Sequence, residues 1–167
     1  ASLRVSLSDL LLELLNYMVY VLHLIMMVFD NNSADNNGGV IYAADDIVID
    51  KINAVFKNNV AGHNGGAIYT AGRSIINTVN AVFDSNSAQS GGAIYFENDG
   101  TGSSSTYINY LNGEFKNNTA SVLGGAIANK NKYAPITNLL GEFTNNKVES
   151  NSMTVSGGAI YNTGVKS

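Results

Sequence analysis

Several residue types that usually mark a chemical site are scarce in this chain of 167 residues. There is no cysteine, which excludes disulfide bonds, thiolate metal sites and a cysteine nucleophile. Charged residues make up only 13% of the sequence, and the formal net charge is −4. Nucleic-acid binding needs a concentrated basic face, so this charge balance argues against a nucleic-acid partner. The single proline is Pro135, whereas asparagine, glycine, serine and tyrosine are abundant.

The abundant residues recur in register. Two motifs alternate along the chain, and each occurs five times. The first is Phe-x-x-Asn, with its ends at Phe29 and Asn32, Phe56 and Asn59, Phe83 and Asn86, Phe115 and Asn118, and Phe143 and Asn146. The second is Gly-Gly-(Ala/Val)-Ile, starting at Gly38, Gly65, Gly91, Gly124 and Gly157. Successive phenylalanines lie 27, 27, 32 and 28 residues apart. This spacing predicts a single domain of stacked repeats in which each unit buries its apolar face against its neighbours.

The residues before each phenylalanine predict a β-strand. Counting back from Phe56, Ala54 and Ile52 fall on the same parity, and the later repeats show the same large, small and aliphatic order. Short strands separated by Asn/Gly turns predict an all-β, right-handed parallel β-helix of five to six coils of about 27 residues. We expect a ladder of phenylalanines inside it, asparagines that bond from coil to coil in a turn, and Gly-Gly corners that need positive φ.

A row of tyrosines is the surface feature most suggestive of binding. The isoleucine of the glycine motif is followed by tyrosine in four repeats, at Tyr42, Tyr69, Tyr95 and Tyr161. If the isoleucines point inward, the tyrosines project outward as a contact stripe that stacks on sugar rings or packs against another solenoid. The alternative is that the rings only stabilise the sheet by stacking between coils.

The two alternating motifs also resemble the repeats of the chlamydial polymorphic outer membrane proteins and related autotransporter passengers. The resemblance spans about residues 29–162 and rests on ten tetrapeptides in alternating order. It implies a right-handed parallel β-helix displayed outside the cell, commonly with an adhesive role. The C-terminal membrane barrel of that family has no counterpart in this sequence, which is also far shorter.

Residues 1–28 break the repeat pattern, and Leu10 to Val28 is nearly all apolar. We interpret residues 1–21 as an apolar N-terminal cap or a degenerate first coil, with the β-helix repeats over 22–167. Ser6 and Asp9 suit a capping box before the apolar run. A membrane span, a signal peptide and a segment inserted into a neighbouring subunit remain alternatives.

Candidate catalytic and metal-binding residues form no convincing constellation. The position after each phenylalanine is Asp30, Lys57, Asp84, Lys116 or Thr144, so stacked coils should set opposite charges side by side. His23 and His63 have no partner at ligand spacing, and the acidic residues Asp45, Asp46 and Asp50 fit a solvated loop. We therefore expect no enzymatic activity, no metal and no cofactor.

The sequence favours a structural function. It predicts a non-catalytic solenoid, extracellular or on the cell surface, that assembles end to end as a fibre subunit or acts as an adhesin-type passenger. Self-association through the solenoid ends is expected, because terminal coils expose unpaired strand edges. A glycan or host-surface ligand is the second expected partner, and membrane contact is expected only if the N-terminal segment inserts. The alternatives are a monomeric carbohydrate-binding adhesin and, less favoured, a polysaccharide-degrading β-helix enzyme.

Overall fold

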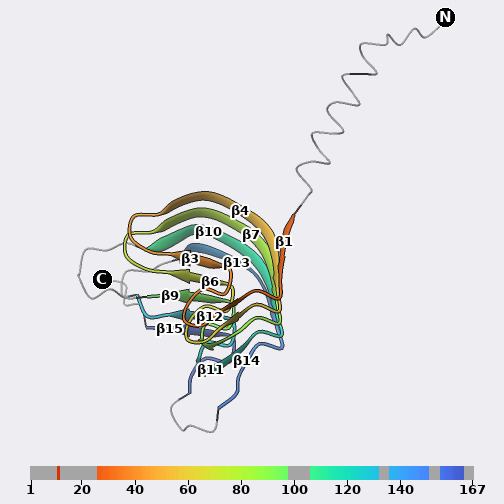
Figure 1. The fold of residues 1–167 in the computed structure, drawn as a ribbon, viewed down its shortest axis with the longest axis vertical. Coiled ribbons are helices and arrows are strands. Elements are labelled where there is room, and N and C mark those ends of the chain that lie inside the picture. The colour runs from red at the N-terminus through yellow and green to blue at the C-terminus, as the bar shows by residue number, and fades with distance from the viewer. Residues whose placement is uncertain (1–10, 12–25, 98–105, 132–135, 151–154, 164–167) are drawn as a thin grey trace, which may run out of the picture.

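The protein is all-β, and a computed structural model describes residue 11 and residues 26–97, 106–131, 136–150 and 155–163. Within these ranges the strands form three parallel sheets of five strands each. The first sheet, called sheet A, contains the longest strands and arches over the rest of the molecule (Figure 1). Its strands, in order across the sheet, are β1 (Met27–Asp30), β4 (Val48–Lys57), β7 (Ile75–Asp84), β10 (Tyr107–Lys116) and β13 (Ile136–Thr144).

The other two sheets complete each turn of the chain. Sheet B contains β2 (Ser33–Ala34), β5 (Val60–Ala61), β8 (Ser87–Ser90), β11 (Thr119–Leu123) and β14 (Lys147–Val148). Sheet C contains β3 (Ile41–Ala43), β6 (Ile68–Thr70), β9 (Ile94–Phe96), β12 (Ile127–Asn129) and β15 (Ile160–Asn162). The chain therefore passes through sheets A, B and C in turn and then returns to sheet A one rung further along.

The register of the strands follows the repeat. Phe29 pairs with Phe56, Phe56 with Phe83, Phe83 with Phe115 and Phe115 with Phe143. Four intervals separate these five positions, so the fold is a parallel β-solenoid of about four turns with a repeat of about 28 residues. The expected number of five to six coils is therefore too high. The expected cap at residues 1–21 lies outside the described residues apart from Leu11.

The apolar core lies between sheets A and C. In sheet A the side chains of Ile52, Ala54 and Phe56 alternate inward and are at most 4% exposed, as the parity of the sequence predicts. The isoleucines that begin the strands of sheet C face them, and Ile68, Ile94 and Ile127 belong to the same buried cluster. Nearer the start of the long strands, the alternation of buried and outward side chains shifts by one residue. In β7, for example, Ile76 and Val79 are both fully buried although they lie three residues apart.

The Gly-Gly corners are required by the backbone in two different ways. The first glycine of each pair has a φ between 57° and 73°, the left-handed region that L side chains disfavour. The second glycine of the first four pairs has no room for a side chain, whereas that of the last pair, Gly158, does. A Cβ at Gly66 would lie 2.1 Å from the carbonyl oxygen of Gly92 and 2.7 Å from the backbone nitrogen of Ser87. The corner of sheet C therefore packs directly against the backbone of the next rung.

We predict that Gly66→Ala destabilises the fold by about 1–3 kcal/mol or more, because the added methyl group overlaps backbone atoms that do not move independently. Gly158→Ala is the matched control, since its Cβ would meet only the Asn146 oxygen, at 4.0 Å. Chemical denaturation of both variants measures the difference. Equal stability of the two variants would contradict the close packing at the inner corners.

Candidate functional site

The phenylalanines form a continuous stack through the core. The ring centroids of neighbouring rungs are 4.7–5.2 Å apart and the rings are within 13° of parallel. Phe56, Phe83 and Phe115 are fully buried, whereas Phe29 and Phe143 pack at the two ends of the cluster. Such aromatic pairs add about 0.5–1.5 kcal/mol each beyond their buried area. The row is thus a structural spine and leaves no free aromatic face inside.

The asparagines three residues later form a buried amide ladder, defined here as Asn32, Asn59, Asn86, Asn118 and Asn146. The Oδ1 of Asn86 accepts two hydrogen bonds from Asn59, from the backbone N–H at 3.0 Å and from Nδ2 at 2.9 Å. The Nδ2 of Asn86 donates to the carbonyl oxygen of Phe56 at 2.9 Å and to Oδ1 of Asn118 at 3.0 Å. The same bonds recur on the other rungs, and the three inner amides are fully buried.

Opposite charges on the outer face of sheet A lie side by side on successive rungs, as the sequence predicts. The row Asp30, Lys57, Asp84 and Lys116 is in register, but its opposite charges form no ion pair in the described chain. The carboxylates accept amide hydrogen bonds instead, Asp30 from Asn58 and Asp84 from Asn117, both at 3.0 Å. Lys116 pairs within its own strand with Glu114, and this hydrogen bond and charge raise the pKa of the lysine.

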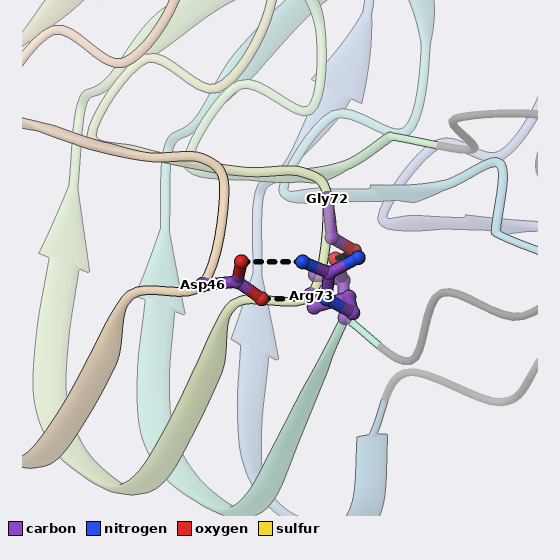
Figure 2. A network of polar contacts seen from close by, with 4 residues as sticks. Asp46, Gly72 and Arg73 are labelled. Atoms are coloured by element: carbon purple, nitrogen blue, oxygen red, sulfur yellow. Dashed lines mark hydrogen bonds and ion pairs between the residues drawn. The ribbon is translucent and has the colours of Figure 1, made fainter.

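A bidentate ion pair joins two successive corners. Figure 2 shows the guanidinium of Arg73 facing the carboxylate of Asp46 across the 27-residue repeat. The hydrogen bond and charge of Arg73 lower the pKa of the Asp46 carboxyl. Asp45 and Asp46 both have positive φ, at 60° and 66°. The acidic loop thus holds one corner against the next through the Asp46–Arg73 ion pair. In the sequence, this pair is indicated by the separation of its two residues, which equals the 27-residue repeat.

No group of three or more histidine, cysteine or acidic side chains suited to a metal ion occurs among the described residues. His63 is exposed, its backbone N–H donates to Asn36, and its carbonyl accepts from Gln89 and Ser90. His23 lies outside the described residues. The part of the chain that the structure describes also contains no helix that meets the length and hydrophobicity of a membrane span.

Each repeat of the solenoid contributes one rung to the Phe, Asn and Gly-Gly ladders. A family model of the Chlamydia polymorphic membrane protein repeat matches the chain five times, at residues 27–44, 53–71, 80–97, 112–130 and 141–163. This chain belongs to that repeat family. The matched segments together cover more than half of the sequence and confirm the resemblance seen in its motifs. No curated protein and no solved structure gives a significant match.

In this member of the Chlamydia polymorphic membrane protein repeat family, the tyrosine row is mostly covered. Tyr42, Tyr69 and Tyr95 stack with centroids 5.0 and 5.8 Å apart. Tyr42 is 60% exposed, but Tyr69 and Tyr95 are only 6% and 3% exposed because they pack in a second cluster with Leu123 and others. A ligand therefore cannot stack on the two middle rings, contrary to what a fully outward stripe requires.

The carboxylate of Glu97 completes this second cluster. Its negative charge acts on the phenols of both Tyr69 and Tyr95. Burial is the main cause that raises the pKa of both phenols well above the usual value, and the negative charge of Glu97 adds to it. Both tyrosines are consequently held neutral in the fold. Spacing alone did not indicate this arrangement, because Glu97 occurs in one repeat only.

The buried hydrogen bonds of the amide ladder should contribute strongly to stability. Asn86→Ala removes the partners of Asn59, Asn118 and the Phe56 carbonyl inside the protein, so we expect a loss of roughly 2–4 kcal/mol. Asn32→Ala, at an exposed rung where water replaces the lost bonds, should cost under about 1 kcal/mol. Urea unfolding measures the loss of stability in each of the two variants. A similar small loss in both variants would show that the inner amides are dispensable.

The stability of the fold should decrease at alkaline pH. Because the folded pKa of Tyr69 and Tyr95 is raised, their stabilisation is complete below the unfolded value of about 10 and is lost as pH rises above it. The midpoint of unfolding should therefore decrease as the pH is raised above about 10. The decrease should be less steep in the double variant Tyr69→Phe/Tyr95→Phe. Tyr42→Phe, at the exposed end of the stack, is the control. An unchanged pH dependence in the double variant would refute this assignment.

Proposed function

We propose that this chain is a non-catalytic structural solenoid of the cell surface whose ends associate with the ends of further copies. In this proposal the copies stack into a surface fibre or a longer adhesive rod. Membership of a membrane-protein repeat family supports the surface location. We expect the solenoid to be right-handed, as parallel crossovers almost always are.

The observation that carries the proposal is the open end of the core at β13. This strand pairs with β10 on one side and with no described strand on the other. Leu139 occupies the row of Val79 and Leu111, which are fully buried, yet it is 39% exposed. A nine-residue strand with an unpaired edge and exposed core positions is a template for another strand.

The amide ladder supports a head-to-tail direction. Each ladder asparagine donates to the next rung and accepts from the rung before it. Among the described residues, nothing donates to Oδ1 of Asn32 and nothing accepts from the backbone N–H of Asn146. The Asn32 end thus presents a hydrogen-bond acceptor, and the Asn146 end presents a hydrogen-bond donor. Complementary ends that do not close into a ring generate open filaments.

The side chains on the outer rows support a non-catalytic function. Asp84, on the row where a catalytic carboxylate would stand, accepts hydrogen bonds from Ser85 and Asn117. Asp50 accepts from Asn77, and Asp46 is paired with Arg73. Carboxylates fixed in this way serve to hold neighbouring rungs together.

The test places a charge on the open end of the core. In Leu139→Lys the ammonium group points inward at the end face, which is how natural edge strands prevent association, so filaments seen by negative-stain electron microscopy should disappear. Leu140→Lys is the matched control, since Leu140 is the next residue, is 53% exposed and lies on the outer side of the same strand. Dispersed rods of the unaltered protein at every concentration tested would rule out end-to-end assembly.

A further inference from the structure

A second row of asparagines lies on the outer face of sheet A. Asn53, Asn80 and Asn112 occupy three successive rungs in register, three residues before the phenylalanine of each repeat. Asn53 and Asn80 are partly exposed and Asn112 is exposed, and the three line one groove of about 410 Å³. The groove runs across the strands, so its direction follows the axis along which the rungs stack.

These amides differ from the other asparagine rows in having no partner. Asn64 donates to Asn37 and Asn109 donates to Asn77, as members of structural rows do. No hydrogen bond is formed by the side chains of Asn53, Asn80 or Asn112 with any residue in the described ranges. Each free amide offers two donors and one acceptor. The row is therefore available for a ligand, whereas the buried amide ladder is not.

The floor of the groove is poor in side chains. Between the asparagine row and the next outward row lie Ala81, Gly113 and Gly141, all of which line the groove. A Cβ at Gly113 would point toward the ring of Phe115, at 3.0 Å, which is the direction of the core. The outer side at these positions is strand backbone, so a ligand can approach the sheet closely between two raised rows of side chains.

The opposite wall of the groove defines the charge of the ligand. It consists of Val82, Glu114 and Glu142, which stand in register on three rungs. No lysine or arginine lines the groove, but Lys116 beside it is paired with Glu114, so Glu142 is the wall carboxylate that forms no ion pair in the described chain. The negative charge of Glu142 repels phosphate and sulfate groups, whereas amide and carboxylate oxygens and amide N–H groups bond well to uncharged hydroxyl groups.

We propose that this groove binds an extended, uncharged glycan chain that lies along the solenoid axis. Equivalent amides repeat at the strand spacing of about 4.8 Å, whereas an extended peptide advances about 3.3 Å per residue and falls out of register with them. A chain of pyranose rings presents hydroxyl groups on every ring, so consecutive rungs can each bond to it. The inference goes beyond the proposed fibre, because the groove lies on the side of the solenoid and stays open when the ends associate.

The test maps binding on the full chain by NMR with side-chain amide signals. The probes are soluble neutral β-1,4-linked hexasaccharides of glucose, N-acetylglucosamine and mannose, with a sulfated heparin-type hexasaccharide as the charged comparison. We expect one neutral probe to shift the amide signals of Asn53, Asn80 and Asn112 while those of Asn59 and Asn86 stay in place. Failure of all three neutral probes, or a preference for the sulfated one, overturns the proposal.

A variant then checks that the amides make the contact. The triple variant Asn53→Ala/Asn80→Ala/Asn112→Ala should weaken binding at least about tenfold, since several hydrogen bonds are lost. Gln89→Ala, an exposed amide on strand β8 of sheet B, is the matched control and should bind as before. Circular dichroism confirms that both variants fold. Unchanged affinity in the triple variant places the glycan elsewhere and refutes the assignment.

Discussion

The structure depends on the hydrogen bonds of the buried amide ladder. An amide in the interior of a protein is costly unless each of its donors and acceptors is paired. Asn59, Asn86 and Asn118 are fully buried and find those partners only on the rungs before and after them. A slip of one residue would break every bond in the row and turn the phenylalanines away from the core. The ladder thus fixes the register, and the apolar stack beside it supplies most of the burial.

The repeat divides the molecule into two kinds of surface. In the proposed assembly the ends associate through the edge of β13 and the direction of the amide ladder. The sides expose outward rows whose members are free to differ from rung to rung without disturbing the register. Glu114 and Glu142 replace Val55 and Val82 on one such row, for example. Assembly and ligand binding can therefore be served by different parts of one simple scaffold.

The sequence predicted the rows of side chains in which every repeat has the same residue type. The phenylalanine, asparagine and Gly-Gly positions recur at nearly constant spacing, and the parity from Ile52 to Phe56 indicated a strand with one buried face. The change of phase between Ile76 and Val79 was not predicted, because it arises where the long strands bend over the core. Burial of Tyr69 and Tyr95 was missed for a similar reason. It depends on Leu123 and Glu97, which occur in single repeats and reach the tyrosines only after the chain has folded.

Hydrogen exchange of asparagine side-chain amides, followed by NMR in the unaltered protein, tests the central claim most directly. If the ladder fixes the register, the Nδ2 groups of Asn59, Asn86 and Asn118 exchange only when rungs separate. They should then be protected by orders of magnitude relative to Asn53, Asn80 and Asn112, with the strongest protection at Asn86 in the middle. Comparable exchange rates in the two rows would contradict the account, because the amides said to hold the rungs together would be open to water.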